Sequence, residues 1–131
     1  MFEPGDIYSF SYLWSWQKEK GEESGRKSRP VCLVLRLPLP ADRLFLFPIA
    51  TKHPEPERAF LMIPKHELAN SGLDGPCWII LDEYNRSEVD DTYDFESLEP
   101  IGRFSKRFFN EVLYAIKAFS ANQRITGILR T

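Results

Sequence analysis

The sequence predicts a mainly β (α+β) fold: a single domain over residues 1–131, built as a small antiparallel β-barrel of about five or more strands with a C-terminal helix packed on it. Three observations lead to this class. Short apolar runs recur along the chain and are separated by polar or Pro-containing segments. Ten Pro against seven Gly argue against a bundle of long helices, since proline interrupts helix interiors. One long segment near the C-terminal end has apolar residues at helical spacing.

The expected strands differ in their burial. Residues 6–12 alternate in side-chain type, with aromatic residues on one side, which predicts a half-buried strand. Residues 31–35 are continuously apolar, as is typical of a central strand that is buried on both faces. Pro48 marks an edge or a bulge in the next strand, because proline cannot donate to a strand ladder. Further strands are expected over residues 44–49, 60–63 and 77–81.

Two helices are expected, one short and one long. Residues 64–70 suit one or two turns, because Pro64 stands near the first helical position and Gly72 follows the end. Residues 105–119 predict the longer helix, with Ser105 as its N-cap. The apolar face of this helix is expected to consist of Phe109, Val112, Leu113, Ile116 and Phe119.

Charge is distributed unevenly along the chain. The polar residues 17–28 predict an exposed, mobile loop. Basic side chains crowd residues 18–36 and 103–130, whereas residues 82–99 hold eight carboxylates and one Arg. The net charge of −2 argues against a nucleic-acid binder. The uneven distribution leaves two interpretations open: ordinary solvated surface, or a dipolar molecule with a basic face for a polyanion.

Several classes of site and location are not supported. Cys32 and Cys77 lie inside apolar runs, where buried free thiols are expected rather than a disulfide, so a reducing cytoplasm is the expected location. No apolar run approaches the roughly 20 residues that span a bilayer, and no signal-peptide pattern is present. His53 and His66 do not stand at ligand spacing from a Cys or another His, so no metal is expected. Dinucleotide, P-loop and serine-hydrolase motifs are absent, and no cofactor is expected.

A series of short motifs in a fixed order covers almost the whole chain. They are Gly5-Asp6-Ile7, the charged loop up to Arg29-Pro30, Val31 to Leu35, the Pro-Ile-Ala-Thr segment ending at Thr51, Trp78 to Leu81 followed by Glu83 and Arg86, and Ile101-Gly102 before the long helix. In this order they resemble the MazF/PemK-like toxin family of type II toxin–antitoxin systems. The resemblance implies an SH3-like barrel that forms a homodimer, cleaves single-stranded RNA as a metal-independent endoribonuclease and is held in check by a cognate antitoxin protein.

The resemblance also implies roles for individual residues. Arg29 falls on the family's catalytic arginine and Thr51 on its catalytic threonine, while Glu23 lies near the family's loop glutamate, with Glu22 as the alternative. Arg86 falls on a basic position that some members have, and it is expected to contact RNA. The other expected RNA contacts are Lys27, Lys52 and Trp16.

The chemistry of RNA cleavage fits these residue types. The 2′-hydroxyl of RNA can attack the adjacent phosphorus without a metal, and a guanidinium can then grip two phosphate oxygens at once. Arginine is a poor general base, so Glu23 or His53 is expected to take the 2′ proton. His53 points to the same side as Thr51 if the chain is extended there, although it can equally be a surface residue. Tyr12, Trp14 and Trp16 can stack on bases, or they can anchor the loop against the barrel or form a dimer contact.

Two alternatives belong to other classes. One is a non-nuclease small-barrel toxin that binds a protein target, such as a DNA gyrase. The other is an interaction module that keeps the fold without the activity. Arg29 together with Thr51 favours the nuclease, because a protein-binding poison needs no phosphate clamp. The net acidity favours the two alternatives.

Overall fold

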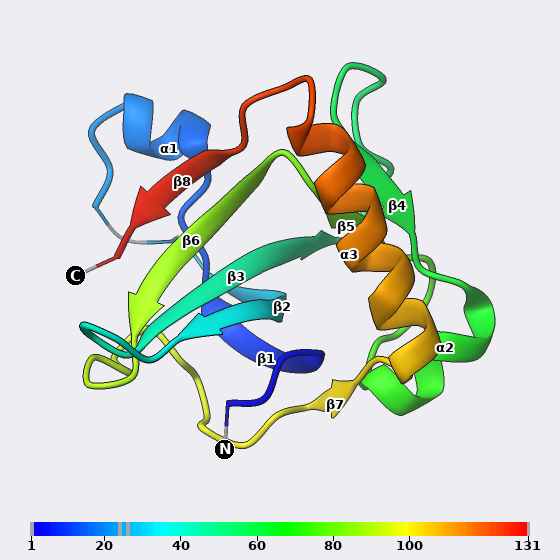
Figure 1. Cartoon of the computed structure of the whole chain (residues 1–131), viewed down its shortest axis with the longest axis horizontal. Helices are drawn as coiled ribbons and strands as arrows, with labels where there is room; N and C mark the ends of the chain where they lie inside the picture. The colour runs from blue at the N-terminus through cyan, green and yellow to red at the C-terminus, as the bar shows by residue number, and fades with distance from the viewer. Residues whose placement is uncertain (1, 24, 26, 131) are drawn as a thin grey trace.

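A curled, mostly antiparallel β-sheet forms the body of the protein (Figure 1). The computed structural model describes residues 2–23, 25 and 27–130. The strands follow the order β4-β5-β3-β2-β1-β7, and β6 pairs with β3 and, in parallel, with β8. Their bounds are β1 (Asp6–Ser11), β2 (Ser28–Leu37), β3 (Arg43–Ala50), β4 (Phe60–Met62), β5 (Trp78–Ile80), β6 (Glu83–Glu88), β7 (Gly102–Arg103) and β8 (Thr126–Leu129). The helices are α1 (Ser15–Glu19), α2 (Lys65–Ser71) and α3 (Lys106–Ser120).

Both faces of the sheet are buried, because alternating residues of β1, β2 and β3 supply two apolar clusters. The helix-side cluster includes Ile7, Cys32 and Phe47 and is covered by Phe108 and Val112 of α3. The expectation of a half-buried strand over residues 6–12 is therefore wrong, since Ile7 and Tyr8 are both fully buried. The aromatic cluster consists of Phe2, Tyr8, Phe10, Tyr12, Val31, Leu33, Leu44, Leu46 and Phe95.

The five predicted strands are present, with ends that differ by a few residues, and three further strands join them. In β6 the buried positions are occupied by polar residues, Glu83, Asn85 and Ser87, so the segment lacks the apolar alternation that marks a strand. The acidic residues 82–99 are therefore not simply a solvated surface. The other additions, β7 and β8, are short and depend on pairing with segments far away in sequence.

Both predicted helices are confirmed, including their end signals. Ser105 caps α3 by accepting a hydrogen bond from the Phe108 amide, and Gly72 ends α2 in the left-handed conformation. The predicted apolar face of α3 was partly wrong: Phe108 is buried, whereas Leu113 is 39 % exposed. The buried carboxylate of Glu67 accepts bonds from the amide and hydroxyl of Ser105, and so ties α2 to the start of α3.

The expected loop over residues 17–28 is partly wrong, because its beginning is helical. The short helix α1 lies beside β8 (Figure 1). Within it Gln17 is buried, and its side chain accepts a hydrogen bond from the Trp14 amide at 3.0 Å. This local bond orders the residues that follow β1.

Cys32 and Cys77 are free and buried, as predicted. Burial raises the pKa of the Cys32 thiol, which keeps it protonated and unreactive. Among the helices of residues 2–23, 25 and 27–130, none is long and apolar enough to cross a membrane.

Candidate functional site

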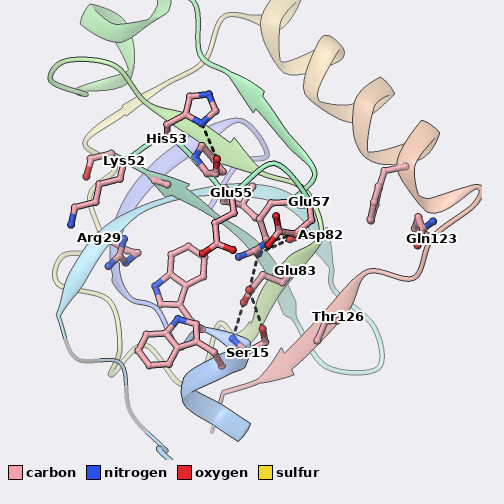
Figure 2. A pocket seen from close by; sticks show the side chains of 18 of the residues that line it. Ser15, Arg29, Lys52, His53, Glu55, Glu57, Asp82, Glu83, Gln123 and Thr126 are labelled. Carbon is pink, nitrogen blue, oxygen red and sulfur yellow. Dashed lines mark hydrogen bonds and ion pairs between the residues drawn. The ribbon is translucent and has the colours of Figure 1, made fainter. Parts of the chain in front are cut away.

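A groove of about 1180 Å³ opens where the ends of several strands meet (Figure 2). Val31 pairs with Pro48, so the beginning of β2 lies beside the end of β3. Thr126 pairs with Glu83, so β6 and β8 begin side by side. The segment before α1, the loop after β3 and the segment after α3 complete the lining. Residues from distant parts of the chain therefore face one space.

Arg29 lies at one side of this groove, near the beginning of β2 (Figure 2). Its guanidinium stands 5.0 Å from the centre of the Trp14 ring, in a cation–π contact. Burial lowers the pKa of Arg29, but a guanidinium stays charged at physiological pH. Among the described residues its buried Nε has no hydrogen-bond partner, and no carboxylate forms an ion pair with the side chain. The groove therefore contains a half-buried cation that no described carboxylate neutralises.

Five other residues predicted from the sequence line the same groove. Thr51 and Lys52 follow β3 directly and are exposed, and Lys27 precedes β2. Trp16 is 42 % exposed and has the Lys20 ammonium 5.4 Å from the centre of its ring. The fifth of these residues is His53.

The His53 side chain packs against neighbouring residues, and the chain from Thr51 to His53 is not extended. Residues 51 and 52 form a bend, so the premise that an extended chain points Thr51 and His53 the same way is wrong. The imidazole packs against Phe60 and Trp78, with ring centres 5.3 and 5.2 Å apart respectively. Its Nδ1 lies 2.8 Å from the Pro54 carbonyl oxygen, which favours a proton on Nδ1 and leaves Nε2 as the basic nitrogen.

Two predicted site residues lie outside the groove lining. Glu23 is exposed in the segment between α1 and β2. Arg86 lies in the middle of β6, where it pairs with Phe45 of β3 and Leu129 of β8. Neither of them therefore lines the groove together with Arg29 and Thr51.

Sequence reasoning missed an ion-pair network in the middle of the groove. Arg58 donates to both oxygens of Asp82, at 2.8 and 2.6 Å, and to Glu83 at 3.0 Å. The bonds to Asp82 raise the pKa of Arg58. Its guanidinium also lies 5.9 Å from the centre of the Trp14 ring. No local motif reveals this network, since 24 residues separate Arg58 from Asp82.

A pair of exposed carboxyl groups, Glu55 and Glu57, was also missed. A hydrogen bond between them raises the pKa of Glu55. Bonds from the backbone and from Glu55 lower the pKa of Glu57. The pair can hold and release a proton at the mouth of the groove.

Within the described part of the chain, no group of three or more His, Cys, Asp or Glu side chains is arranged to hold a metal ion. Comparison with protein-family models and with curated proteins finds no match to this chain.

Proposed function

We propose that this protein is a metal-independent endoribonuclease that cleaves single-stranded RNA, and that it acts as the toxin of a type II toxin–antitoxin pair. The observation that carries the proposal is the Arg29 guanidinium, which is half-buried in the groove and unneutralised by any described carboxylate. A half-buried charge without a carboxylate partner has lost part of its hydration, so an anionic ligand in the groove would be favoured by it. Thr51, Lys27 and Lys52 in the same groove add a hydroxyl and two cations.

The reaction needs no group from outside the RNA and the protein. The 2′-oxygen attacks the adjacent phosphorus and loses its proton to a base. The bond from phosphorus to the 5′-oxygen breaks, its electron pair stays on the 5′-oxygen, and this oxygen takes up one proton, so that a 2′,3′-cyclic phosphate and a 5′-hydroxyl result. Arg29 stabilises the negative charge that develops on the phosphate oxygens, and Thr51 donates a further hydrogen bond. The groove offers two acceptors for the 2′ proton, His53 Nε2 and the pair formed by Glu55 and Glu57.

The aromatic residues of the groove fit a single-stranded ligand. Trp16 is exposed enough to stack on a base, and stacking of this kind tolerates any sequence. The curled sheet with α3 against it is compatible with an SH3-like barrel. The homodimer, the antitoxin partner and the cytoplasmic location of the proposal rest on the family resemblance and on the free thiols.

The test is a cleavage assay on long labelled single-stranded RNA in the presence of EDTA. The wild type is expected to produce discrete fragments, and Arg29→Ala is expected to lose roughly 100- to 1000-fold in rate, as when one oxyanion donor is removed. Arg107→Ala is the matched control, since Arg107 is exposed on α3 and outside the groove. Equal rates for wild type and Arg29→Ala would remove Arg29 from the mechanism.

A second candidate function is the binding of a protein target without cleavage. The observation that favours it is the acidic rim of Glu55 and Glu57 in a protein whose net charge is −2. The salt dependence of RNA binding distinguishes the two functions. Binding of RNA through phosphates weakens steeply as salt rises, and a correctly folded protein that neither cleaves RNA nor shows this dependence would favour the protein target.

A further inference from the structure

The carboxylate of Glu83 is the centre of a cluster of four hydrogen bonds. It is 2 % exposed and lies at the first position of β6, at the floor of the groove. Its Oε2 accepts bonds from the Tyr12 hydroxyl and the Ser15 amide, both at 3.0 Å. Its Oε1 accepts bonds from the Ser15 hydroxyl at 3.2 Å and from Arg58 at 3.0 Å.

Three of these four donors come from the segment that carries the groove tryptophans. Tyr12 and Ser15 flank Trp14, and Trp16 follows directly. The Tyr12 and Trp14 rings are 5.0 Å apart and meet edge to face, and Arg29 lies against the Trp14 ring. The chain therefore connects Glu83 to Arg29 through one short segment and one aromatic ring.

From this arrangement we infer that Glu83 is a positioning residue: it anchors the segment 12–16, and through Trp14 it fixes the direction of the Arg29 guanidinium in the groove. The inference rests on the proposed function for what Arg29 does, but the anchoring itself is independent of RNA. Each bond to a buried charge is of the stronger kind. The bonds to Glu83 act together with two bonds between Asn85 and the backbone of Leu13, at 2.9 and 2.8 Å, but only those to Glu83 reach both Tyr12 and Ser15 on either side of Trp14.

Direct acid–base chemistry does not suit Glu83. Both of its oxygens already accept two hydrogen bonds each, and it is almost fully buried. Burial and the neighbouring Glu83 charge raise the pKa of Tyr12 well above its ordinary value, so the Tyr12 hydroxyl remains a donor. A proton placed on Glu83 would have to displace one of these donors.

The adjacent carboxylate provides a matched control. Asp82 also binds Arg58, but its other bond is to the Ala59 amide, and it makes none to the segment 12–16. Glu83→Gln and Asp82→Asn therefore both remove one negative charge beside Arg58. Only Glu83→Gln also disturbs the hydrogen bonds that hold the segment 12–16.

The experiment follows the three indole N–H signals of the protein by NMR and, in parallel, the pH dependence of RNA cleavage without metal. Glu83→Gln is expected to shift or broaden the signals of Trp14 and Trp16 and to leave that of Trp78 in place. It is expected to lower the maximal cleavage rate by roughly ten- to a hundredfold, as small misplacements of a reacting group do, and to keep the shape of the pH profile. Asp82→Asn is expected to cause a much smaller change in both measurements.

Unchanged Trp14 and Trp16 signals in Glu83→Gln would overturn the inference, whether or not the protein cleaves RNA. Equal effects of Glu83→Gln and Asp82→Asn would assign the effect to Arg58 instead, and loss of one limb of the pH profile would make Glu83 an acid or base. An inactive wild type would refute the proposed function while the indole signals still tested the anchor. If Glu83→Gln does not fold, Tyr12→Phe removes one donor and keeps the ring, and the same signals are expected to move by less.

Discussion

Two arginines contact the ring of Trp14, and they differ in whether a carboxylate lies beside them. Arg58 is enclosed by Asp82 and Glu83, with bonds of 2.6 to 3.0 Å. Arg29 lies 5.0 Å from the centre of the same ring and has no carboxylate partner among the described residues. Both side chains are partly buried, so the difference is one of charge balance rather than of exposure.

The contrast separates a structural cation from a candidate ligand-binding one. An ion pair with several hydrogen bonds holds its members in place, and it leaves little attraction for a further anion. A half-buried guanidinium without a carboxylate partner has lost part of its hydration, and an incoming phosphate can supply that partner. We therefore expect changes at Arg58 to act on stability and changes at Arg29 to act on ligand binding and cleavage.

The largest expected effect concerns stability. Arg58→Ala leaves the buried Glu83 without its cation, and removal of one member of a buried pair is expected to lower the free energy of unfolding by about 3 kcal/mol. Arg29→Ala breaks no ion pair, so little change is expected. Urea unfolding followed by circular dichroism compares the two variants. Equal losses for both would show that the distinction between the two arginines is false.

The next effect concerns the geometry of the Arg29 side chain. Arg29→Lys keeps the positive charge and loses the planar guanidinium, which can donate hydrogen bonds to two phosphate oxygens at once. A charge-assisted hydrogen bond contributes about 1.5–3 kcal/mol, so the single-turnover cleavage rate is expected to fall by roughly 10- to 100-fold. A wild-type rate in Arg29→Lys would mean that charge alone is sufficient.

A smaller effect is expected from the exposed lysines of the groove. Lys27→Ala and Lys52→Ala each remove one phosphate contact, and each should reduce the slope of log affinity against log salt by about 0.7 for single-stranded RNA. Titrations at several salt concentrations measure the slope. Lys65→Ala, on α2 and outside the groove, is the control, and an equal reduction there would indicate a diffuse effect of net charge.

The smallest expected effect is a change of RNA affinity with pH, caused by the pair Glu55 and Glu57. Glu57 raises the pKa of Glu55, so below that pKa the pair carries one negative charge and above it two. RNA affinity is therefore expected to fall, by about two- to threefold, as pH rises through the raised pKa of Glu55. Glu57→Gln removes the neighbouring carboxylate and should move this fall to lower pH. An unshifted fall, measured by fluorescence titration at a series of pH values, would exclude the pair as its cause.

Local signals in the sequence determined much of the fold. Ser105 and Gly72 end their helices as predicted, because a cap depends on only a few neighbouring residues. The continuous apolar run at residues 31–35 predicted a buried strand, which is correct for residues 31–34 and wrong for Leu35, which is 44 % exposed. The family resemblance assigned roles to Arg29 and Thr51; both residues line the groove, and their roles stay a prediction.

What only the tertiary structure decided is how the polar residues are paired. Glu83 and Asn85 occupy buried positions of β6, and an apolar pattern cannot indicate a strand whose interior side is polar. Their burial is stable only because distant segments satisfy their polar atoms. Tyr12, Ser15 and Arg58 bond to Glu83, whereas Leu13 and Arg130 bond to Asn85. For the same reason the neighbours of Arg29 in sequence do not reveal that no described carboxylate pairs with it. A charge is neutralised by what surrounds it in space, and that depends on the complete fold.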